Sequence, residues 1–338
     1  MKILVTGGCG FIGSHFVHLA IANGVEVVNL DKLTYAGNPE NVADLAEDPR
    51  YTFVQGDIAD PAVVALATDG VEVVVNFAAE SHVDRSILDP GEFIRTDVLG
   101  TATLLQAARE AGVRRFVQVS TDEVYGSILD GAFTETHPIA PSSPYSASKA
   151  GGDLQVLAWH HTYGVDAIIT RGSNTYGPHQ YPEKLIPLFV TNALDEQPLP
   201  VYGDGMQIRD WMHVADHCAG IWHAMTHGIA GEVYNVGGGH EVPNIEITRA
   251  ILELTGRDAT LIRHVADRPG HDRRYALDTT KLHTLGWKPA RTFTDGLRET
   301  VDWYTQRRAW WEPIKAGEYR RYYETQYGSR GTASSDPH

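Results

Sequence analysis

Short apolar runs alternate with longer segments of helical spacing through the first half of the chain. Six of these runs are predicted strands: residues 3–5, 26–30, 52–54, 73–77, 116–119 and 167–169. Several are almost entirely apolar, as is typical of parallel strands covered on both faces by helices. Segments 12–22, 93–111 and 146–163 between them have helical spacing. The alternation predicts an α/β fold, a doubly wound parallel sheet of the Rossmann type.

The pattern changes after about residue 172, where proline and glycine become frequent and the apolar runs become short. Helical spacing returns at 214–225, 245–254 and 294–304. We therefore expect three parts: a Rossmann domain over 1–172, to which later segments return; a smaller α/β lobe covering the ligand over 173–327; and a disordered tail over 328–338.

Composition narrows the classes of partner. The formal net charge of -15 argues against nucleic acid or an acidic membrane surface. Cys9 and Cys218 form no CxxC pair, and no His-rich spacing indicates a metal site. No apolar run approaches the ~20 residues that cross a bilayer, and MKILVTGG is typical of a strand, not a signal peptide. We expect a cytoplasmic protein without metal.

A glycine-rich loop follows the first strand. In TGGCGFIGS, Gly7, Gly10 and Gly13 stand between strand and helix, where the backbone can approach a pyrophosphate at the helix N-terminus. Asp31 ends the second strand, where a carboxylate binds ribose hydroxyls and repels a 2′-phosphate. The pattern predicts an NAD site and disfavours NADP, although the adjacent Lys32 weakens that preference. A tight turn without a nucleotide is the alternative.

The run from Ser120 to Gly126 places Asp122 and Glu123 at the end of the fifth strand. In this fold class, ligands bind at the carboxyl ends of the strands. Adjacent side chains on a strand point to opposite faces, so both acids reach one ligand only if the chain has left the strand at Thr121. The alternative is structural, because Ser120-x-x-Glu123 also matches a capping box that merely starts a helix.

Tyr145 and Lys149 stand four residues apart in PSSPYSASKAGGD, on one face of a predicted helix. A nearby ammonium stabilises a phenolate, so such a tyrosine is expected to accept a proton from a sugar hydroxyl near neutral pH. A surface pair is the alternative, since YxxxK is a common spacing.

These residues together suggest a redox-neutral reaction on a hexose. Tyr145 deprotonates the hydroxyl on carbon 4 as hydride leaves that carbon for NAD, which makes the hydrogen on carbon 5 acidic. Glu123 removes that proton, neutral Asp122 protonates the departing hydroxyl on carbon 6, and hydride returns to carbon 6. Close carboxyls favour such opposite protonation states. Thr121 is placed to bond the oxygen on carbon 4.

The sequence resembles the dTDP-glucose 4,6-dehydratases, a family of extended short-chain dehydrogenase/reductases, from Met1 to about Trp311. The resemblance lies in TGGCGFIGS, LDKLTYAGN, AAESHVDRSI, STDEVYGS, YSASK, YGPHQYPEKLIP, YGDGMQIRDW and DRPGHDRRYALD. It implies a lyase that uses NAD and acts on a nucleoside-diphosphate hexose, dTDP-glucose. It also implies a homodimer paired through helices 93–111 and 146–163.

The resemblance implies further site residues. For NAD these are Phe11, Ile12, Asp31, Lys32, Leu33, Thr34, Asp57, Ile58, Ala78, Ala79, Ser81, Thr96 and Thr175, together with Tyr145 and Lys149. For the sugar nucleotide they are Ser81, Thr121, Asn174, Lys184, Leu185, Pro200, Tyr202, Arg209, Asn235, Asp267, Arg268 and His271. Cations among them suit a diphosphate. Two residues depart from the family: Cys9 replaces alanine, and Thr175 replaces asparagine, which alters a contact on the nicotinamide side.

Two other functions use the same elements. A sugar-nucleotide 4-epimerase would need the glycine loop, Tyr145 and Lys149, but it would have no use for Asp122. A non-catalytic NAD-binding sensor would not need the proton-transfer residues, all of which are present. The thymine base follows from the resemblance alone.

Overall fold

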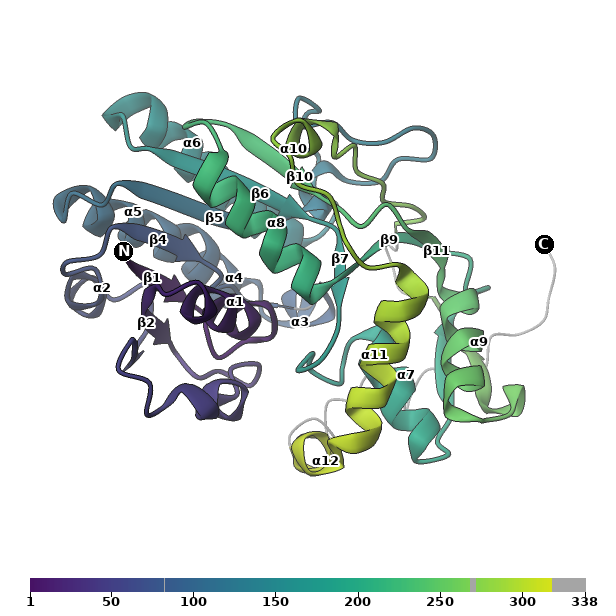
Figure 1. Cartoon of the computed structure of the whole chain (residues 1–338). Coiled ribbons are helices and arrows are strands. Elements are labelled where there is room, and N and C mark those ends of the chain that lie inside the picture. Colours follow the sequence, from purple (N-terminus) through teal and green to yellow (C-terminus); the bar gives the residue numbers. More distant parts are fainter. Residues whose placement is uncertain (82, 268–271, 318–338) are drawn as a thin grey trace.

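A seven-stranded parallel sheet forms the centre of the computed structural model, which describes residues 1–81, 83–267 and 272–317 (Figure 1). Its strand order is β10-β6-β5-β4-β1-β2-β3, with every pairing parallel. The bounds are β1 Lys2–Thr6, β2 Glu26–Asp31, β3 Tyr51–Gln55, β4 Val73–Asn76, β5 Arg115–Thr121, β6 Ala167–Gly172 and β10 Val233–Val236. The order reverses between β1 and β4, where open α/β sheets bind their ligands.

Helices cover both faces of this sheet. Helices α1 (Phe11–Ala22) and α8 (Val214–His227) share one apolar core with it, and α2 (Pro61–Ala67), α5 (Thr101–Glu110) and α6 (Pro144–Tyr163) share the other. Strands such as β4 are buried along their whole length, which explains their unbroken apolar sequence. The predicted doubly wound α/β fold is confirmed.

The segment predicted as one helix over 93–111 is built from three pieces. After α3 (Val83–Leu88), the chain forms α4 (Pro90–Phe93), a π-helix η2 (Ile94–Gly100) and then α5. The π-helix packs closely on α6, where a Cβ at Gly152 would lie 2.8 Å from the carbonyl oxygen of Asp97. Apolar spacing does not separate a π turn from an α turn, so the sequence predicted only the continuous helix.

A smaller lobe lies beside the sheet and has its own apolar core (Figure 1). It contains a sheet of β11 (Glu241–Pro243), β9 (Ile208–His213) and β7 (Asn174–Tyr176), and a parallel pair of β12 (Ile262–Val265) and β8 (Leu199–Tyr202). Its helices are α7 (Leu185–Leu194), α9 (Asn244–Thr255), α11 (Phe293–Gln306) and α12 (Arg308–Ala316). Short elements complete the chain: η1 (Pro39–Leu45), η3 (Asp122–Tyr125), η4 (Ala259–Leu261) and α10 (Thr280–Thr284).

Segments after residue 172 contribute to both regions. Strand β10 pairs with β6 in the large sheet, α8 packs on the same sheet, and α10 contacts β10. The assignment of 1–172 and 173–327 to two functional domains stays a prediction. The expected tail over 328–338 lies outside the described residues.

Candidate active site

One pocket opens at the carboxyl ends of β1, β2, β4, β5 and β6. It extends from the loop after β2 to the segment before α7, so both regions of the molecule contribute to its wall. The lining residues are Gly7, Gly10, Phe11, Ile12, Gly13, Leu30, Asp31, Lys32, Thr34, Ala36, Gly37, Gly56, Asp57, Ile58, Phe77, Ala78, Ala79, Glu80, Ser81, Thr96, Val119, Ser120, Thr121, Asp122, Glu123, Tyr145, Lys149, Gly172, Ser173, Asn174, Thr175, Gln180, Tyr181, Glu183, Lys184 and His217.

The glycine loop turns from β1 into α1 at one end of this pocket. Gly7 has a φ of 68°, and a Cβ there would lie 2.8 Å from the backbone nitrogen of Ala78. Gly10 precedes α1 and provides no side-chain cap, so the first amides of the helix are open to an anion. The loop therefore fits a pyrophosphate.

Asp31 lies at the end of β2 on the same wall and is only 7% exposed. One carboxylate oxygen accepts from the amide of Leu33 at 2.8 Å and the other from the amide of Cys9 at 2.9 Å. Burial raises the pKa of the Asp31 carboxyl, and these two amides oppose that rise. The carboxylate keeps lone pairs for ribose hydroxyls.

The charge of Lys32 is neutralised within the protein. Its ammonium lies 3.2 Å from Asp57 and 3.6 Å from Glu92. Lys32 is therefore engaged with carboxylates and does not make the Asp31 end of the pocket a site for a 2′-phosphate. The donor set fits NAD better than NADP.

Nearly all the predicted cofactor residues line this pocket. The exception is Leu33, whose φ of 57° turns the chain and aims its amide at Asp31. The residues brought together are Gly7, Gly10, Phe11, Ile12, Gly13, Asp31, Lys32, Thr34, Asp57, Ile58, Ala78, Ala79, Ser81, Thr96, Tyr145, Lys149 and Thr175.

The acid pair stands just after β5, and the chain has already left the strand. Strand β5 ends at Thr121, whose hydroxyl caps η3 by accepting from the amide of Glu123 at 3.2 Å. Asp122 and Glu123 are the first residues of η3, and both line the pocket. The capping-box alternative with Ser120 as cap is wrong, because Ser120 is still part of β5 and Thr121 takes the cap position.

Asp122 is 2% exposed. Its Oδ1 lies 3.2 Å from the hydroxyl of Thr121, and its Oδ2 has no hydrogen-bond partner among the described residues. Burial raises the pKa of the Asp122 carboxyl well above its usual value, and the negative charges of Glu123 and Asp210 add to the rise. The site favours a neutral carboxylic acid at this position, which is the form that can donate a proton.

Tyr145 and Lys149 come from the first turns of α6. A capping box between Ser143 and Ser146 starts this helix, and the Lys149 ammonium donates to the carbonyl of Val119 at 2.8 Å. Both Tyr145 and Lys149 line the pocket beside η3. The predicted helical pair is therefore present.

The ammonium of Lys149 was expected to lower the phenolic pKa of Tyr145. This expectation is wrong when only the groups of the protein are considered. Burial raises this pKa well above its usual value, the carboxylates of Glu123 and Asp97 raise it further, and a hydrogen bond with Thr121 opposes the rise. The Lys149 ammonium, which donates to the carbonyl of Val119, keeps its positive charge but does not reverse this rise.

A buried polar cluster that no sequence argument identified joins three parts of the wall. Glu183, before α7, accepts from the hydroxyl of Tyr35 at 3.0 Å and pairs with Arg85 at 3.1 Å. The Arg85 guanidinium lies over the Tyr35 ring at 3.6 Å, and the Tyr35 hydroxyl also donates to the carbonyl of Ser81 at 2.8 Å. Glu183 stands within the string YPEKLIP, and that string was the one available signal for it.

Only some of the predicted substrate residues lie in the pocket. Ser81, Thr121, Asn174 and Lys184 line it, and Leu185 begins α7 directly after Lys184. The Oδ1 atom of Asn174 is buried and has no partner among the described residues, so it is free to accept from a ligand.

Apart from Asn235, the remaining predicted substrate residues that are described lie outside the lining, in or beside the smaller lobe: Pro200, Tyr202, Arg209 and Asp267. The guanidinium of Arg209 is 4.4 Å from the centre of the Tyr275 ring and donates to two backbone carbonyls, those of Ile208 and Asp272. Arg268 and His271 lie outside the described residues.

Asn235 is not brought to the pocket. It lies on β10 with no exposure, where its Oδ1 accepts from Tyr125 at 2.9 Å and its Nδ2 donates to the carbonyls of Phe133 and Asp278. Its amide therefore holds the sheet edge together.

Asn244, at the start of α9, has a buried Oδ1 without a partner among the described residues.

Thr175 bonds a neighbouring histidine. Its hydroxyl donates to the carbonyl of Ser173 at 3.1 Å and lies 2.8 Å from Nδ1 of His217, which also lines the pocket. Burial lowers the pKa of His217 to about 3, so this histidine is neutral.

The described ranges also bear on metal and membrane sites. Within them, no three His, Cys, Asp or Glu side chains gather as a metal-binding set, and no helix is long and apolar enough to span a bilayer. Cys9 and Cys218 are both free and buried.

Comparison with known proteins decides the family. A family model described as GDP-mannose 4,6 dehydratase matches residues 4–300. The dTDP-glucose 4,6-dehydratase of Streptomyces niveus is 54% identical over 323 residues, which cover 94% of this chain and 96% of that one. The chain belongs to the dTDP-glucose 4,6-dehydratase family.

Solved structures agree with this family. The dTDP-glucose 4,6-dehydratase from Streptomyces venezuelae, crystallised with NAD bound, superposes with a TM-score of 0.92 at 55% identity, covering 93% of this chain and 100% of that one. A UDP-glucose 4-epimerase from Thermus thermophilus, also in complex with NAD, has a TM-score of 0.85 at 33% identity over 91% of this chain and all of that one. Fold alone therefore does not separate dehydratase from epimerase, and the distinction depends on Asp122 and Glu123.

Proposed function

We propose that this protein is a dTDP-glucose 4,6-dehydratase, which converts dTDP-glucose to dTDP-4-keto-6-deoxyglucose. The observation that carries the proposal is the pairing of a buried Asp122, which favours its neutral form, with Glu123 in one pocket beside Tyr145. An epimerase needs no acid to expel a hydroxyl from carbon 6. The relatives of that name, at 54% and 53% identity over more than nine-tenths of the chain, support the same activity.

The residues divide the reaction between them. Tyr145 takes the proton of the hydroxyl on carbon 4, and Thr121 bonds the oxygen left there. Glu123 then removes the proton on carbon 5, which the neighbouring ketone has made acidic, while Asp122 gives its proton to the hydroxyl that leaves carbon 6. Once carbon 6 has been reduced, Glu123 gives a proton, exchanged with solvent, back to carbon 5. Two adjacent carboxyls can serve as acid and base at one pH because burial and mutual repulsion keep Asp122 protonated.

The cofactor proposed for this pocket is NAD. Gly7, Gly10 and the start of α1 would hold its pyrophosphate, and Asp31 would hold the adenosine ribose. When bound, NAD supplies the acceptor for the hydride from carbon 4, the donor of that hydride to carbon 6, and a positive charge beside Tyr145. Lys149 is buried, with 4% exposure, and its ammonium is held by the carbonyl of Val119. In this position it would orient the ribose of the cofactor next to the phenol of Tyr145.

We propose a homodimer paired through η2, α5 and α6. Ile94, Leu99 and Leu154 lie on η2 and α6, and each is more than half exposed. Large apolar side chains on two adjoining helices suit a helix-to-helix interface. A Leu154→Glu variant should shift the mass measured by light scattering to that of one chain, whereas Leu66→Glu, at another exposed leucine, should not.

The proposal includes a cytoplasmic location. The thiols of Cys9 and Cys218 are both free in the structure, as is typical of proteins in a reducing compartment. Fractionation of cells that express a tagged chain tests this location.

The activity is tested by incubating the purified protein with NAD and dTDP-glucose, without any reductant. Mass spectrometry of the product should give a mass lower than the substrate by one water. An unchanged mass with an inverted carbon 4 would instead make the protein an epimerase. No product from any of several nucleoside-diphosphate hexoses would favour a sensor.

A further inference from the structure

Helix α12 lies beyond the stretch that the family model matches and lines no part of the pocket, yet it connects the two walls of the pocket. Its Trp310 reaches the loop after β2, and its charged residues reach the far end of α7. Because α7 begins at Leu185, next to the pocket-lining Lys184, α12 contacts elements from both sides of the cleft.

A chain of hydrogen bonds runs from α12 to the ribose-binding carboxylate. The Trp310 indole donates to Oδ1 of Asn41 at 2.9 Å. Asn41, buried in η1, donates through Nδ2 to the carbonyl of Cys9 at 3.0 Å. The amide of Cys9 donates in turn to Oδ2 of Asp31 at 2.9 Å. Each link is a direct contact between two groups of the protein.

The loop held by this chain is part of the cofactor wall. Ala36 and Gly37 line the pocket, and a Cβ at Gly37 would lie 2.8 Å from Oδ1 of Asp31. The amide of Asn38 bonds the same Cys9 carbonyl at 3.0 Å, so Asn38 and Asn41 converge on one oxygen of the glycine loop. The position of this loop therefore depends on contacts that end on α12.

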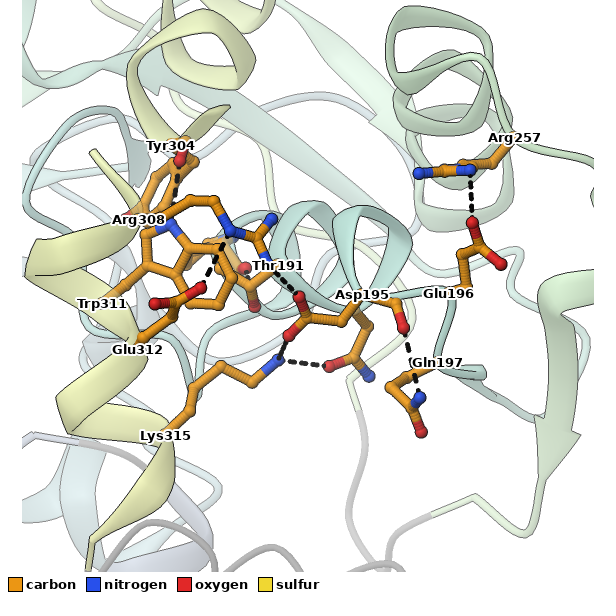
Figure 2. Close-up of polar contacts among 12 residues, drawn as sticks. Thr191, Asp195, Glu196, Gln197, Arg257, Tyr304, Arg308, Trp311, Glu312 and Lys315 are labelled. Atoms are coloured by element: carbon orange, nitrogen blue, oxygen red, sulfur yellow. Dashed lines mark hydrogen bonds and ion pairs between the residues drawn. The ribbon is translucent and has the colours of Figure 1, made fainter. Parts of the chain in front are cut away.

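The other side of α12 is fixed to α7 (Figure 2). Arg308 pairs with Asp195 at 2.5 Å, and Lys315 donates to Asn192 at 2.9 Å, both at the C-terminal end of α7. Trp311 is fully buried between them and donates to the carbonyl of Tyr304 at 2.8 Å. Cations at the C-terminal end of a helix are favourable partners for its exposed carbonyls.

We propose that α12 is a clasp that holds the loop at residues 33–45 in the conformation that binds NAD, with Trp310 and Asn41 as positioning residues. The clasp connects this loop to α7, so that the cofactor wall and the substrate wall share one support. The clasp rests on the proposed function in one respect, namely that NAD occupies this pocket.

Two variants break different links; one is isosteric and the other keeps an aromatic ring. Trp310→Phe keeps an aromatic ring beside Trp303 but removes the N–H that reaches Asn41. Asn41→Asp keeps the acceptor for Trp310 but replaces the donor to Cys9 with a carboxylate oxygen. Trp159→Phe, at a partly buried tryptophan of α6 in the core on the other face of the sheet, is the control.

Two readouts are needed, and neither is turnover. The first is amide hydrogen exchange of residues 33–45 in the NAD-free full-length protein, which should become several-fold faster in both variants and stay unchanged in the control. The second is the dissociation constant for NAD by calorimetry, which should rise about 3- to 10-fold, the range for one or two neutral hydrogen bonds.

Unchanged exchange in Trp310→Phe and Asn41→Asp would overturn the clasp, whatever the affinity for NAD. Faster exchange with an unchanged dissociation constant would also overturn it, because the loop would then not govern binding. If the parent protein bound no NAD, the proposed cofactor would fail, and the exchange of residues 33–45 would still decide whether α12 orders the loop.

Discussion

The hydroxyl of Thr121 lies 3.2 Å from Oδ1 of Asp122 and, in the same position, caps the turn that carries Glu123. One threonine at the end of β5 thus bonds the carboxyl of Asp122 and the backbone amide of Glu123. Asp122 is buried, and one of its carboxyl oxygens has no partner among the described residues. A ligand in the pocket is therefore the main acceptor available for its proton. The first predictions follow from this arrangement.

Asp122→Asn should separate the two halves of the reaction. The amide cannot protonate the hydroxyl on carbon 6, so we expect turnover to fall about 10²- to 10⁴-fold. Oxidation at carbon 4 does not need this acid, so reduced cofactor should accumulate on the enzyme and be visible by its absorbance. Asp130→Asn, at an exposed acid, is the control, and normal turnover in Asp122→Asn would remove Asp122 from its role.

Tyr145→Phe should stop the reaction earlier. Without the phenol, no group takes the proton from the hydroxyl on carbon 4, so neither reduced cofactor nor product should form. The fold should be retained, because the variant keeps the buried ring and removes only a hydroxyl that is neutral in the free protein. Stopped-flow absorbance after mixing with dTDP-glucose measures this, and a normal burst of reduced cofactor would rule out Tyr145 as the base.

The stability of Asp122→Asn should depend on pH relative to the parent. The folded-state pKa of Asp122 is raised above its unfolded value, so the parent loses stability as pH rises through and above about 4. An asparagine amide does not ionise, so the variant carries no cost of burying a charge or of holding a proton at this position. We expect the variant to be close to the parent in stability near pH 4 and more stable above it, by about 1.4 kcal/mol for each pH unit up to the folded-state pKa of Asp122.

Urea unfolding at several pH values measures this difference. Asp97, whose pKa burial raises to about 6, titrates equally in both proteins, so it does not affect the comparison. A stability difference that stays constant between about pH 4 and pH 7.5 would contradict the buried-acid assignment of Asp122.

Gly7→Ala should weaken NAD binding far more than a comparable change elsewhere. Alanine would need a φ near 68° and would crowd the backbone of Ala78 at 2.8 Å. Gly24 has a φ of 74° with no atom within 4 Å of an added Cβ, so Gly24→Ala shares the backbone strain of about 1–2 kcal/mol without the crowding. Calorimetric titration with NAD should give a markedly higher dissociation constant for Gly7→Ala alone. Equal affinities in the two variants would mean that the glycine loop does not hold the cofactor.

Much of the sheet could be predicted from the sequence, because its strands are apolar throughout and are separated by helical spacing. All six predicted strands are present, and the end of β6 at Gly172 departs furthest from its expected bound, residue 169. Helix α7 was not predicted because most of its ten residues are buried, which leaves no polar face to reveal its period. Strand β10 was missed because it joins the sheet from a part of the chain where turns dominate.

The site was predictable where a motif lies within one short stretch of sequence, as for Gly7, Tyr145 and Lys149. It was less predictable where distant segments meet. The contact of Tyr35 with Glu183 joins residues 148 positions apart, and no local pattern reports such a contact. Asn235 was assigned to the substrate by resemblance, but its position on β10 commits its amide to the protein. The phenolic pKa of Tyr145 also depends on Asp97, which the YxxxK spacing does not include.

Isotope transfer tests the central claim most directly, since it follows the hydrogens that Tyr145, Glu123 and Asp122 are proposed to direct. dTDP-glucose carrying deuterium on carbon 4 should yield a keto-sugar with that deuterium on carbon 6 and, in heavy water, one solvent deuterium on carbon 5. A product that keeps its label on carbon 4, or that gains no solvent hydrogen on carbon 5, would contradict the dehydratase assignment.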